Sequence, residues 1–170
     1  MEISDEFKLE FLNEILSDTT NLKIISNKEQ LITFGKLIPG MMPLHPDGGK
    51  SISHFEFIAD SLEVKDVDFI KRQFEKNMEF DYMQLEKYGF RVFDLQKLRK
   101  NRGTFDLYDT LAEMNKGFDS FYRTIITKPI FNEKKDKAYI MVNNFGGATY
   151  LLKMENGVWK IKSEFHNYVE

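Results

Sequence analysis

The sequence KAYIMVNNFGGATYLLKMENGVWKIKSEF, residues 137–165, decides the fold because it contains the clearest turn signal in the chain. Asn156 and Gly157 lie between two runs in which apolar and polar residues alternate. This dipeptide favours a two-residue type I′ turn, in which both central residues need a positive φ. The stretch therefore predicts a β-hairpin that turns at these two residues.

The alternation also predicts the register of this hairpin. Pairing outward from the turn without interruption places Met154 opposite Trp159 and Ala148 opposite Phe165. A slip of one residue would mix apolar and polar side chains on each face, so the turn and the pattern agree on this register. The predicted pairs in between are Lys153–Lys160, Leu152–Ile161, Leu151–Lys162 and Tyr150–Ser163. The predicted apolar face consists of Ala148, Tyr150, Leu152, Met154, Trp159, Ile161 and Phe165.

The segments before the hairpin predict the fold class. Residues 137–145 have apolar side chains on both faces, which is typical of a central strand, and residues 121–131 predict a further strand. Helices early in the chain and strands late in it predict an α+β fold, with N-terminal helices packed on a C-terminal antiparallel β-meander. The predicted helices span 4–17, 66–78 and 104–117, and the apolar stripe of the second consists of Val67, Ile70, Phe74 and Met78.

The middle of the chain has shorter and less regular patterns. Residues 51–64 alternate between two faces and predict a strand. The other predicted elements are strands at 21–26 and 90–95, a helix at 82–88 that ends at Gly89, and an element at 30–38 that fits a helix or a strand.

Length and composition are those of a soluble globular protein with a single domain over residues 1–170, in which residues 1–20 form a docked N-terminal helix. Sixteen Phe and seven Tyr predict a core built from aromatic side chains. The net charge of −3 argues against nucleic acid as a partner. The chain has no cysteine, which excludes disulfides and thiolate chemistry.

The sequence predicts no transmembrane segment, because no apolar run approaches the roughly 18 residues that a membrane-spanning helix needs. The first residues, MEISD, lack the basic and apolar regions of a signal peptide. Met1 is therefore either the native start of a cytoplasmic protein or a replacement for a removed export leader. The second alternative leaves a lipid anchor open.

A long loop is predicted at residues 39–49, PGMMPLHPDGG, which contain three of the four prolines. Proline and glycine interrupt both helical and strand patterns there. Loops of this length in compact domains are often functional. Met41, Met42 and Leu44 are apolar and adaptable in shape, so this loop is the predicted place for contact with a partner.

Three residues are candidates for binding a small ligand. His45 lies in this loop, and the predicted strand at 51–64 would place His54 and Glu56 on one face. Imidazole and carboxylate groups can supply the few polar contacts of a pocket. No metal-ligand signature or nucleophile motif accompanies them, so the sequence predicts no catalytic residue, no metal site and no cofactor.

Several short segments near the C-terminus carry a resemblance. They are TKPIFN (127–132), KAY (137–139), GG (146–147), YLLK (150–153) and NGVWKI (156–161). Together they resemble the end of a group of uncharacterised bacterial proteins that often look like exported proteins or lipoproteins. The resemblance implies export to the periplasm or the cell surface, and it implies no activity. At the level of fold, helices followed by a meander are similar to cystatin-like and NTF2-like domains.

Three functions are compatible with these observations. The first is a non-catalytic binding or interaction domain of a bacterial protein, with residues 39–49 at the interface. The second is a small-molecule pocket, open to enzymatic use, on the curved sheet. The third is an intracellular immunity-type protein that neutralises a toxin through its acidic surface. The absence of a catalytic motif favours the first, and the resemblance favours export over the cytoplasm.

Overall fold

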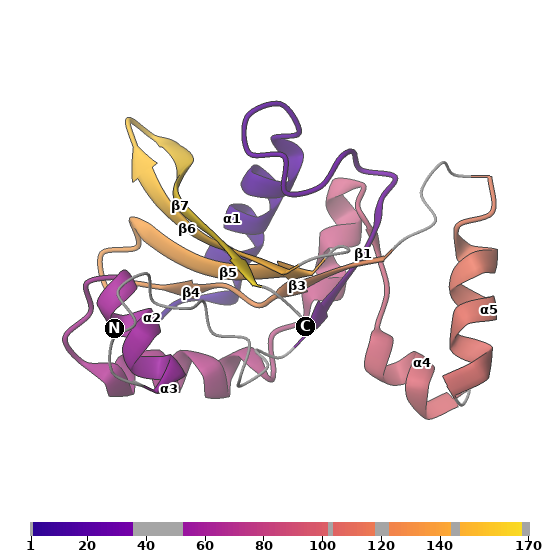
Figure 1. Cartoon of the computed structure of the whole chain (residues 1–170), viewed down its shortest axis with the longest axis horizontal. Helices are drawn as coiled ribbons and strands as arrows, with labels where there is room; N and C mark the ends of the chain where they lie inside the picture. The colour runs from indigo at the N-terminus through magenta and orange to yellow at the C-terminus, as the bar shows by residue number, and fades with distance from the viewer. Residues whose placement is uncertain (1, 36–52, 102–103, 118–122, 144–146, 168–170) are drawn as a thin grey trace.

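A computed structural model describes residues 2–35, 53–101, 104–117, 123–143 and 147–167. Its strands form one mixed sheet in the order β2-β1-β3-β5-β6-β7, and β4 pairs with β5 beside this path (Figure 1). The helices are α1 (Asp5–Ser17), α2 (His54–Ser61), α3 (Val67–Asn77), α4 (Leu95–Asn101) and α5 (Thr104–Met114), with the 3-10 helix η1 (Tyr82–Tyr88). The strands are β1 (Leu31–Gly35), β2 (Arg91–Val92), β3 (Arg123–Thr127), β4 (Ile130–Phe131), β5 (Lys137–Asn143), β6 (Gly147–Glu155) and β7 (Val158–Asn167).

The predicted α+β fold class is confirmed, since helices precede the antiparallel strands β5, β6 and β7. The sheet also has a parallel part that the sequence did not predict, because β1 pairs in parallel with both β2 and β3. The sequence left residues 30–38 open between a helix and a strand, and the structure shows a strand over Leu31–Gly35. Its first four residues are all buried, as expected of a parallel strand inside a covered sheet.

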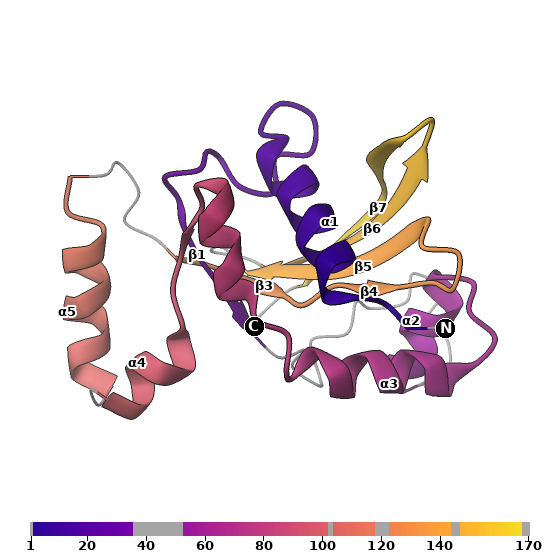
Figure 2. The same ribbon diagram turned by 180° about the vertical axis from the view of Figure 1, so that it is seen from behind.

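Helix α1 covers one face of the sheet. Ser4 caps the helix, because its hydroxyl accepts a hydrogen bond from the Phe7 backbone N–H at 3.2 Å. The Phe11 ring meets the rings of Phe131 and Trp159 edge-on, with centroids 4.8 Å apart in both pairs. Each such contact adds about 0.5–1.5 kcal/mol beyond the area that it buries. Figures 1 and 2 show α1 across the sheet from α2 and α3.

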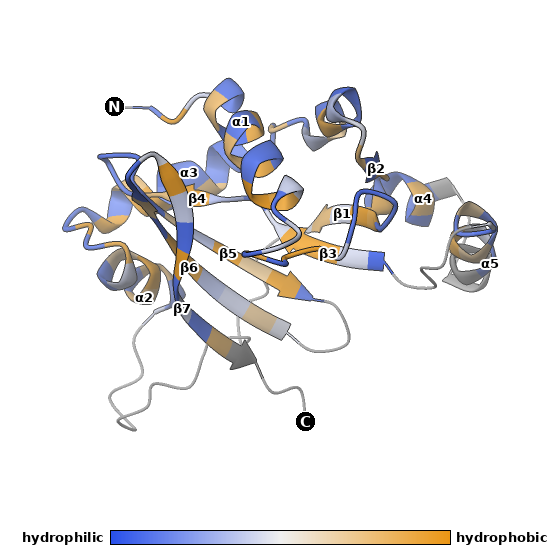
Figure 3. Cartoon of the chain, turned by 90° about the horizontal axis from the view of Figure 1, so that it is seen from above, coloured by the Kyte–Doolittle hydropathy of each residue, from blue (hydrophilic) through white to orange (hydrophobic). Residues whose placement is uncertain are grey.

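Helices α2 and α3 lie on the other side of the sheet from α1. On α2, the Phe57 ring contacts Tyr139 of β5 and Phe165 of β7, with centroids 6.4 and 6.2 Å apart. On α3, Gln73 forms two hydrogen bonds with the backbone of Phe131, donating to its carbonyl at 2.7 Å and accepting from its N–H at 2.9 Å. Apolar residues concentrate on β3 and β5 in the middle of the sheet (Figure 3).

Helices α4 and α5 stand apart from the other helices, at the end of the sheet next to β1 (Figure 1). They enclose a small second core that also includes Leu31 of β1. The next residue, Ile32, belongs to the main core, so β1 is shared between the two cores. The other buried members of the second core are Phe93, Leu95 and Leu111. Within the described ranges, no helix is both long enough and apolar enough to cross a membrane.

The turn of the C-terminal hairpin is confirmed. Asn156 and Gly157 have φ of 53° and 78°, as the predicted turn requires. The central position of residues 137–143 is confirmed as well, since β5 has paired strands on both sides. The confirmed hairpin pairs are Met154–Trp159, Lys153–Lys160 and Leu152–Ile161.

Beyond these pairs the predicted register is wrong. A β-bulge between Leu151 and Leu152 leaves Lys162 on β7 as the additional residue. An extra residue bends a strand and turns the side chains after it to the other face. Phe165 therefore leaves the predicted apolar face and contacts Phe57 of α2 instead. The predicted pairs Leu151–Lys162, Tyr150–Ser163 and Ala148–Phe165 are replaced by Leu151–Ser163, Tyr150–Glu164 and Ala148–His166.

The strand predicted at residues 51–64 is wrong, because His54–Ser61 form helix α2. Its start is a capping box: the Ser53 hydroxyl accepts from the Glu56 N–H at 3.2 Å, and the Glu56 carboxylate accepts from the Ser53 N–H at 3.3 Å. These two bonds satisfy N–H groups that a helix start leaves unpaired. Local hydrogen bonding therefore outweighs the alternating pattern here.

Several other predicted elements change as well. Residues 21–26 form turns and bends without a strand, and residues 90–95 contain only the two-residue strand β2 before α4 begins. The described part of 121–131 is divided into β3 and β4, with Lys128 and Pro129 between them. Proline has no N–H to give to the ladder, which explains the division. Residues 82–88 form η1, and Gly89 ends it with a φ of 89°.

Candidate functional site

The structure describes two of the three sequence-predicted ligand residues, and it does not place these two on one face. His54 and Glu56 are two positions apart on α2, so they lie about 200° apart around the helix axis rather than on one strand face. Glu56 is exposed and its carboxylate caps the helix. His45 falls in residues 36–52, outside the described residues, as does the whole predicted loop at 39–49. Ligand binding by these three residues stays a prediction.

His54 connects α2 to the central strand. Its Nε2 lies 3.1 Å from the Tyr139 hydroxyl, and this hydroxyl also hydrogen-bonds to the Thr149 side chain. Burial lowers the pKa of His54 and raises the pKa of Tyr139, so both groups are held in their neutral forms. Neutral groups that satisfy one another under a helix fix that helix on the sheet. This pair is therefore a structural contact.

A pocket of about 520 Å³ lies at the carboxyl ends of the three parallel strands. Gly35 ends β1, Thr127 ends β3, and Asp94 follows β2 closely; all three line the pocket. The last turn of α3 and the start of η1 complete its wall. Parallel strands commonly bind ligands beyond their carboxyl ends, where the loops diverge from an ordered backbone. We call this space the strand-end pocket.

Aromatic rings form much of the wall of the strand-end pocket. They belong to Phe34, Phe74, Phe80 and Tyr82. The centroids of Phe34 and Tyr82 are 4.9 Å apart. Burial raises the pKa of Tyr82, so its hydroxyl stays protonated, and this hydroxyl hydrogen-bonds to the Thr33 side chain. The wall therefore offers flat apolar surfaces of the kind that small ligands stack against.

Two carboxylates enter the pocket from the starts of helices. Asp81 precedes η1 and accepts a hydrogen bond from the Met83 N–H at 3.1 Å. Asp94 precedes α4 and accepts from the Lys97 N–H at 3.0 Å. Each bond holds one carboxylate oxygen at a helix start and so orients the group. The exposed carboxylate of Glu75 on α3 is a third negative charge on the lining.

Lys128 is the cation among the described residues that line the strand-end pocket. Its ammonium group donates to the backbone carbonyl of Asn77, at the C-terminal end of α3. The same nitrogen lies 5.5 Å from the centroid of the Tyr82 ring, within the range of a cation–π contact. A helix C-terminus carries a partial negative charge, which favours a cation at this point. The pocket wall thus already holds one ammonium group.

Asn77 has a buried polar atom that no described group satisfies. Its side chain is only 5% exposed, and its Nδ2 donates to the Pro129 carbonyl at 3.1 Å. This bond fixes the orientation of the amide, because a flip would bring two oxygens together. In the part of the chain that the structure describes, Oδ1 has no hydrogen-bond partner. An unpaired buried acceptor costs about 1–3 kcal/mol, so a donor that bonded to this oxygen would stabilise the protein.

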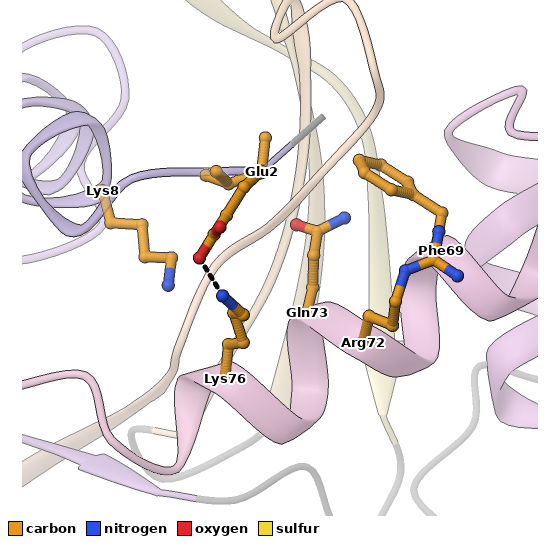
Figure 4. A pocket seen from close by; sticks show the side chains of 7 residues that line it. Glu2, Lys8, Phe69, Arg72, Gln73 and Lys76 are labelled. Carbon is orange, nitrogen blue, oxygen red and sulfur yellow. Dashed lines mark hydrogen bonds and ion pairs between the residues drawn. The ribbon is translucent and has the colours of Figure 1, made fainter.

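A second pocket, of about 460 Å³, lies between α1 and α3 (Figure 4). Three cations line it, and each forms an ion pair with a carboxylate. Lys8 is nearly fully buried, and its ammonium lies 3.0 Å from Asp5; Lys76 pairs with Glu2. The third pair is Arg72 with Asp66, 3.2 Å apart. These charges are compensated, so this pocket lacks the unsatisfied group found at Asn77.

Sequence reasoning missed the strand-end pocket. Asp81 and Asp94 carried a usable signal, because Asp is a common residue at a helix start. The helical stripe predicted for α3 was displaced: Met78 is 66% exposed, whereas Gln73 and Asn77 are buried. Polar residues are not expected on the buried face of a helix, so the spacing of apolar residues did not indicate Asn77.

No metal site accompanies the pocket in the described ranges, where no three His, Asp or Glu side chains gather closely enough to hold an ion. Comparisons with protein-family models, curated proteins and solved structures found no significant match to this chain. The case for function therefore depends on the geometry of the pocket.

Proposed function

We propose that this chain is a non-catalytic binding domain that holds a small molecule with a flat apolar part in the strand-end pocket. The observation that carries the proposal is a 520 Å³ pocket at the carboxyl ends of β1, β2 and β3 that combines aromatic walls with a few oriented polar groups. Pockets for small ligands typically measure about 300–1,000 Å³ and have this mixture of surfaces.

The polar groups of the pocket are suited to binding. The two oriented carboxylates, Asp81 and Asp94, already accept backbone hydrogen bonds, and Tyr82 is kept protonated by burial. A general base needs a pKa near the working pH and free access to a proton. The buried hydroxyl of Tyr82 is unsuited to this role, and Asp81 and Asp94 each already bind a backbone N–H, which supports recognition of a ligand rather than proton transfer.

Indole is a suitable first probe, because it is flat, neutral and small. We expect indole to bind with a dissociation constant on the order of millimolar, as its size allows. In an NMR titration of the ¹⁵N-labelled chain, the amides of Phe34, Tyr82 and Lys128 should shift in a saturable way. No shift, or shifts that map to the pocket between α1 and α3, would refute the proposal.

A matched pair of variants sharpens this test. Phe74 lines the pocket, whereas Phe55 packs edge-on against Phe74, with centroids 4.9 Å apart, and does not line it. Phe74→Ala should weaken indole binding severalfold, because it removes a stacking surface. Phe55→Ala removes the same kind of ring from the same cluster and should leave the affinity within about twofold. Equal losses in both variants would place the indole elsewhere.

A further inference from the structure

Among the described residues that line the strand-end pocket, negative charge predominates. Asp81, Asp94 and Glu75 contribute carboxylates, and Lys128 contributes one ammonium group. The last turn of α3, which also faces the pocket, adds the partial negative charge of a helix C-terminus. The other cation of that turn, Lys76, pairs with Glu2 and lines the second pocket instead. A positively charged ligand is therefore favoured over a neutral or negative one.

One hydrogen-bonding group of the pocket requires a donor from the ligand. The Oδ1 of Asn77 is buried, has no partner among the described residues and can only accept. Its Nδ2 is bound to the Pro129 carbonyl, so the amide cannot turn around to offer a donor instead. The group that satisfies this oxygen must therefore be an N–H or an O–H.

The aromatic walls suit a cation as well. Phe34, Phe74 and Tyr82 line the pocket, and the faces of aromatic rings attract cations. Lys128 shows this preference within the protein, since its ammonium lies over the Tyr82 ring and donates to the Asn77 carbonyl. A ligand ammonium beside this point would meet the same combination of ring face and carbonyl oxygen.

We propose that the strand-end pocket selects an organic cation, an amine or a guanidinium joined to a flat apolar group, and that Asn77 Oδ1 accepts a hydrogen bond from it. This inference depends on the proposed binding function and adds the class of ligand. The apolar part of the ligand lies against the rings, and its charged part lies among Asn77, Asp81 and Asp94.

Three indole probes of nearly equal size test the charge preference. They are tryptamine, which is a cation at pH 7, 3-propylindole, which replaces the ammonium with a methyl group, and indole-3-propionate, which is an anion. Calorimetric titration should show tryptamine binding at least tenfold more tightly than 3-propylindole, and the anion more weakly still. Equal affinities would overturn the cation inference while leaving a binding pocket. Binding of none of the three would overturn the proposed function itself.

Isosteric variants separate charge from shape. Asp94→Asn keeps the oxygen that accepts from Lys97 and removes the charge, so helix α4 keeps its start. We expect it to weaken tryptamine binding about three- to tenfold and to leave 3-propylindole unchanged. Asp109→Asn, at an exposed position on α5 that does not line the pocket, is the matched control. An unchanged preference for tryptamine in Asp94→Asn would exclude this carboxylate from recognition.

Asn77→Leu tests the hydrogen bond. It removes Oδ1 and should weaken tryptamine binding about tenfold, with little effect on 3-propylindole. Asn115→Leu makes the same change at a side chain that is 6% exposed but lies outside the pocket, so it should leave both affinities unchanged. Equal losses for both probes in Asn77→Leu would show that the residue only shapes the pocket. If the variant does not fold, the Asp94→Asn result still decides between a cation site and a neutral one.

Discussion

Two buried amides on α3 illustrate how neighbouring polar residues differ in what they contribute to the molecule. Gln73 satisfies both the N–H and the carbonyl of Phe131, whereas Asn77 satisfies the Pro129 carbonyl and keeps one oxygen unpaired. The first side chain completes the edge of the sheet, and the second leaves an acceptor beside a pocket. Hydrogen bonding, rather than burial, separates the structural residue from the candidate functional one.

This difference predicts unequal losses of stability. Gln73→Leu leaves two buried backbone groups of Phe131 unpaired and should lower the free energy of unfolding by about 2–4 kcal/mol. Asn77→Leu removes one hydrogen bond but also removes the unpaired oxygen, so it should cost about 1 kcal/mol or less. Urea denaturation of the two variants measures both values. A loss at Asn77 as large as that at Gln73 would mean that its oxygen is satisfied in the folded protein.

The buried His54 predicts a pH dependence of stability. Its folded pKa is lowered by burial, so the unfolded chain binds the additional proton as the pH falls. The stabilisation is fully present above the unfolded pKa of about 6.5 and is lost as the pH falls from there toward the folded pKa.

Urea denaturation between pH 7.5 and 5 should show this decline, and His54→Gln should reduce its slope. Tyr139→Phe removes the 3.1 Å contact but leaves the imidazole covered, so it should lower stability and keep the slope. If His54→Gln does not change the slope, another group is responsible for the decline.

At the scale of elements, α2 shows why an alternating pattern was insufficient. The side chains of 51–64 alternate as in a strand. Ser53 and Glu56, however, have the spacing of a capping box, and the segment from His54 forms a helix. N-cap residues alone, Ser4 and Asp66, correctly predicted the starts of α1 and α3. The hairpin turn was predictable because two residues determine it, whereas no short sequence signal marks the bulge that turns Phe165 toward α2.

The capping box of α2 can be tested directly. Ser53→Ala should lower the free energy of unfolding by about 1 kcal/mol, because one N–H at the helix start loses its acceptor. Glu56→Gln keeps an acceptor oxygen and should cost much less. Thermal or urea unfolding compares the two variants. An equal or larger effect of Glu56→Gln would indicate that its charge has a role beyond the helix cap.

At the scale of the whole molecule, the candidate site depends on parallel pairing that no short segment could reveal. Leu31 pairs with Arg91 on one side and with Arg123 on the other. The residues that line the pocket come from five elements or their ends, and only this pairing brings them to one edge. Sequence reasoning thus predicted the α+β class and several elements, but it could not place the pocket.

The two cores predict unequal local stability. Leu111→Ala removes a buried side chain of the small core around α4 and α5. We expect hydrogen exchange to accelerate in α4, α5 and β2, with protection in β5 and α1 retained, because those elements belong to the main core. A uniform increase in exchange across all elements would show that the two cores unfold together.

The parallel pairing of β1 also has a consequence for how the chain folds. Gln30, just before β1, donates to the Thr124 hydroxyl of β3, and this bond joins residues 94 positions apart. Pairings between distant parts of a chain are slow to form, because the entropy of closing a long loop is lost before the new contacts compensate for it. During synthesis, β1 must wait until about three quarters of the chain has been made, so we expect the strand-end pocket to be among the last features of the protein to assemble.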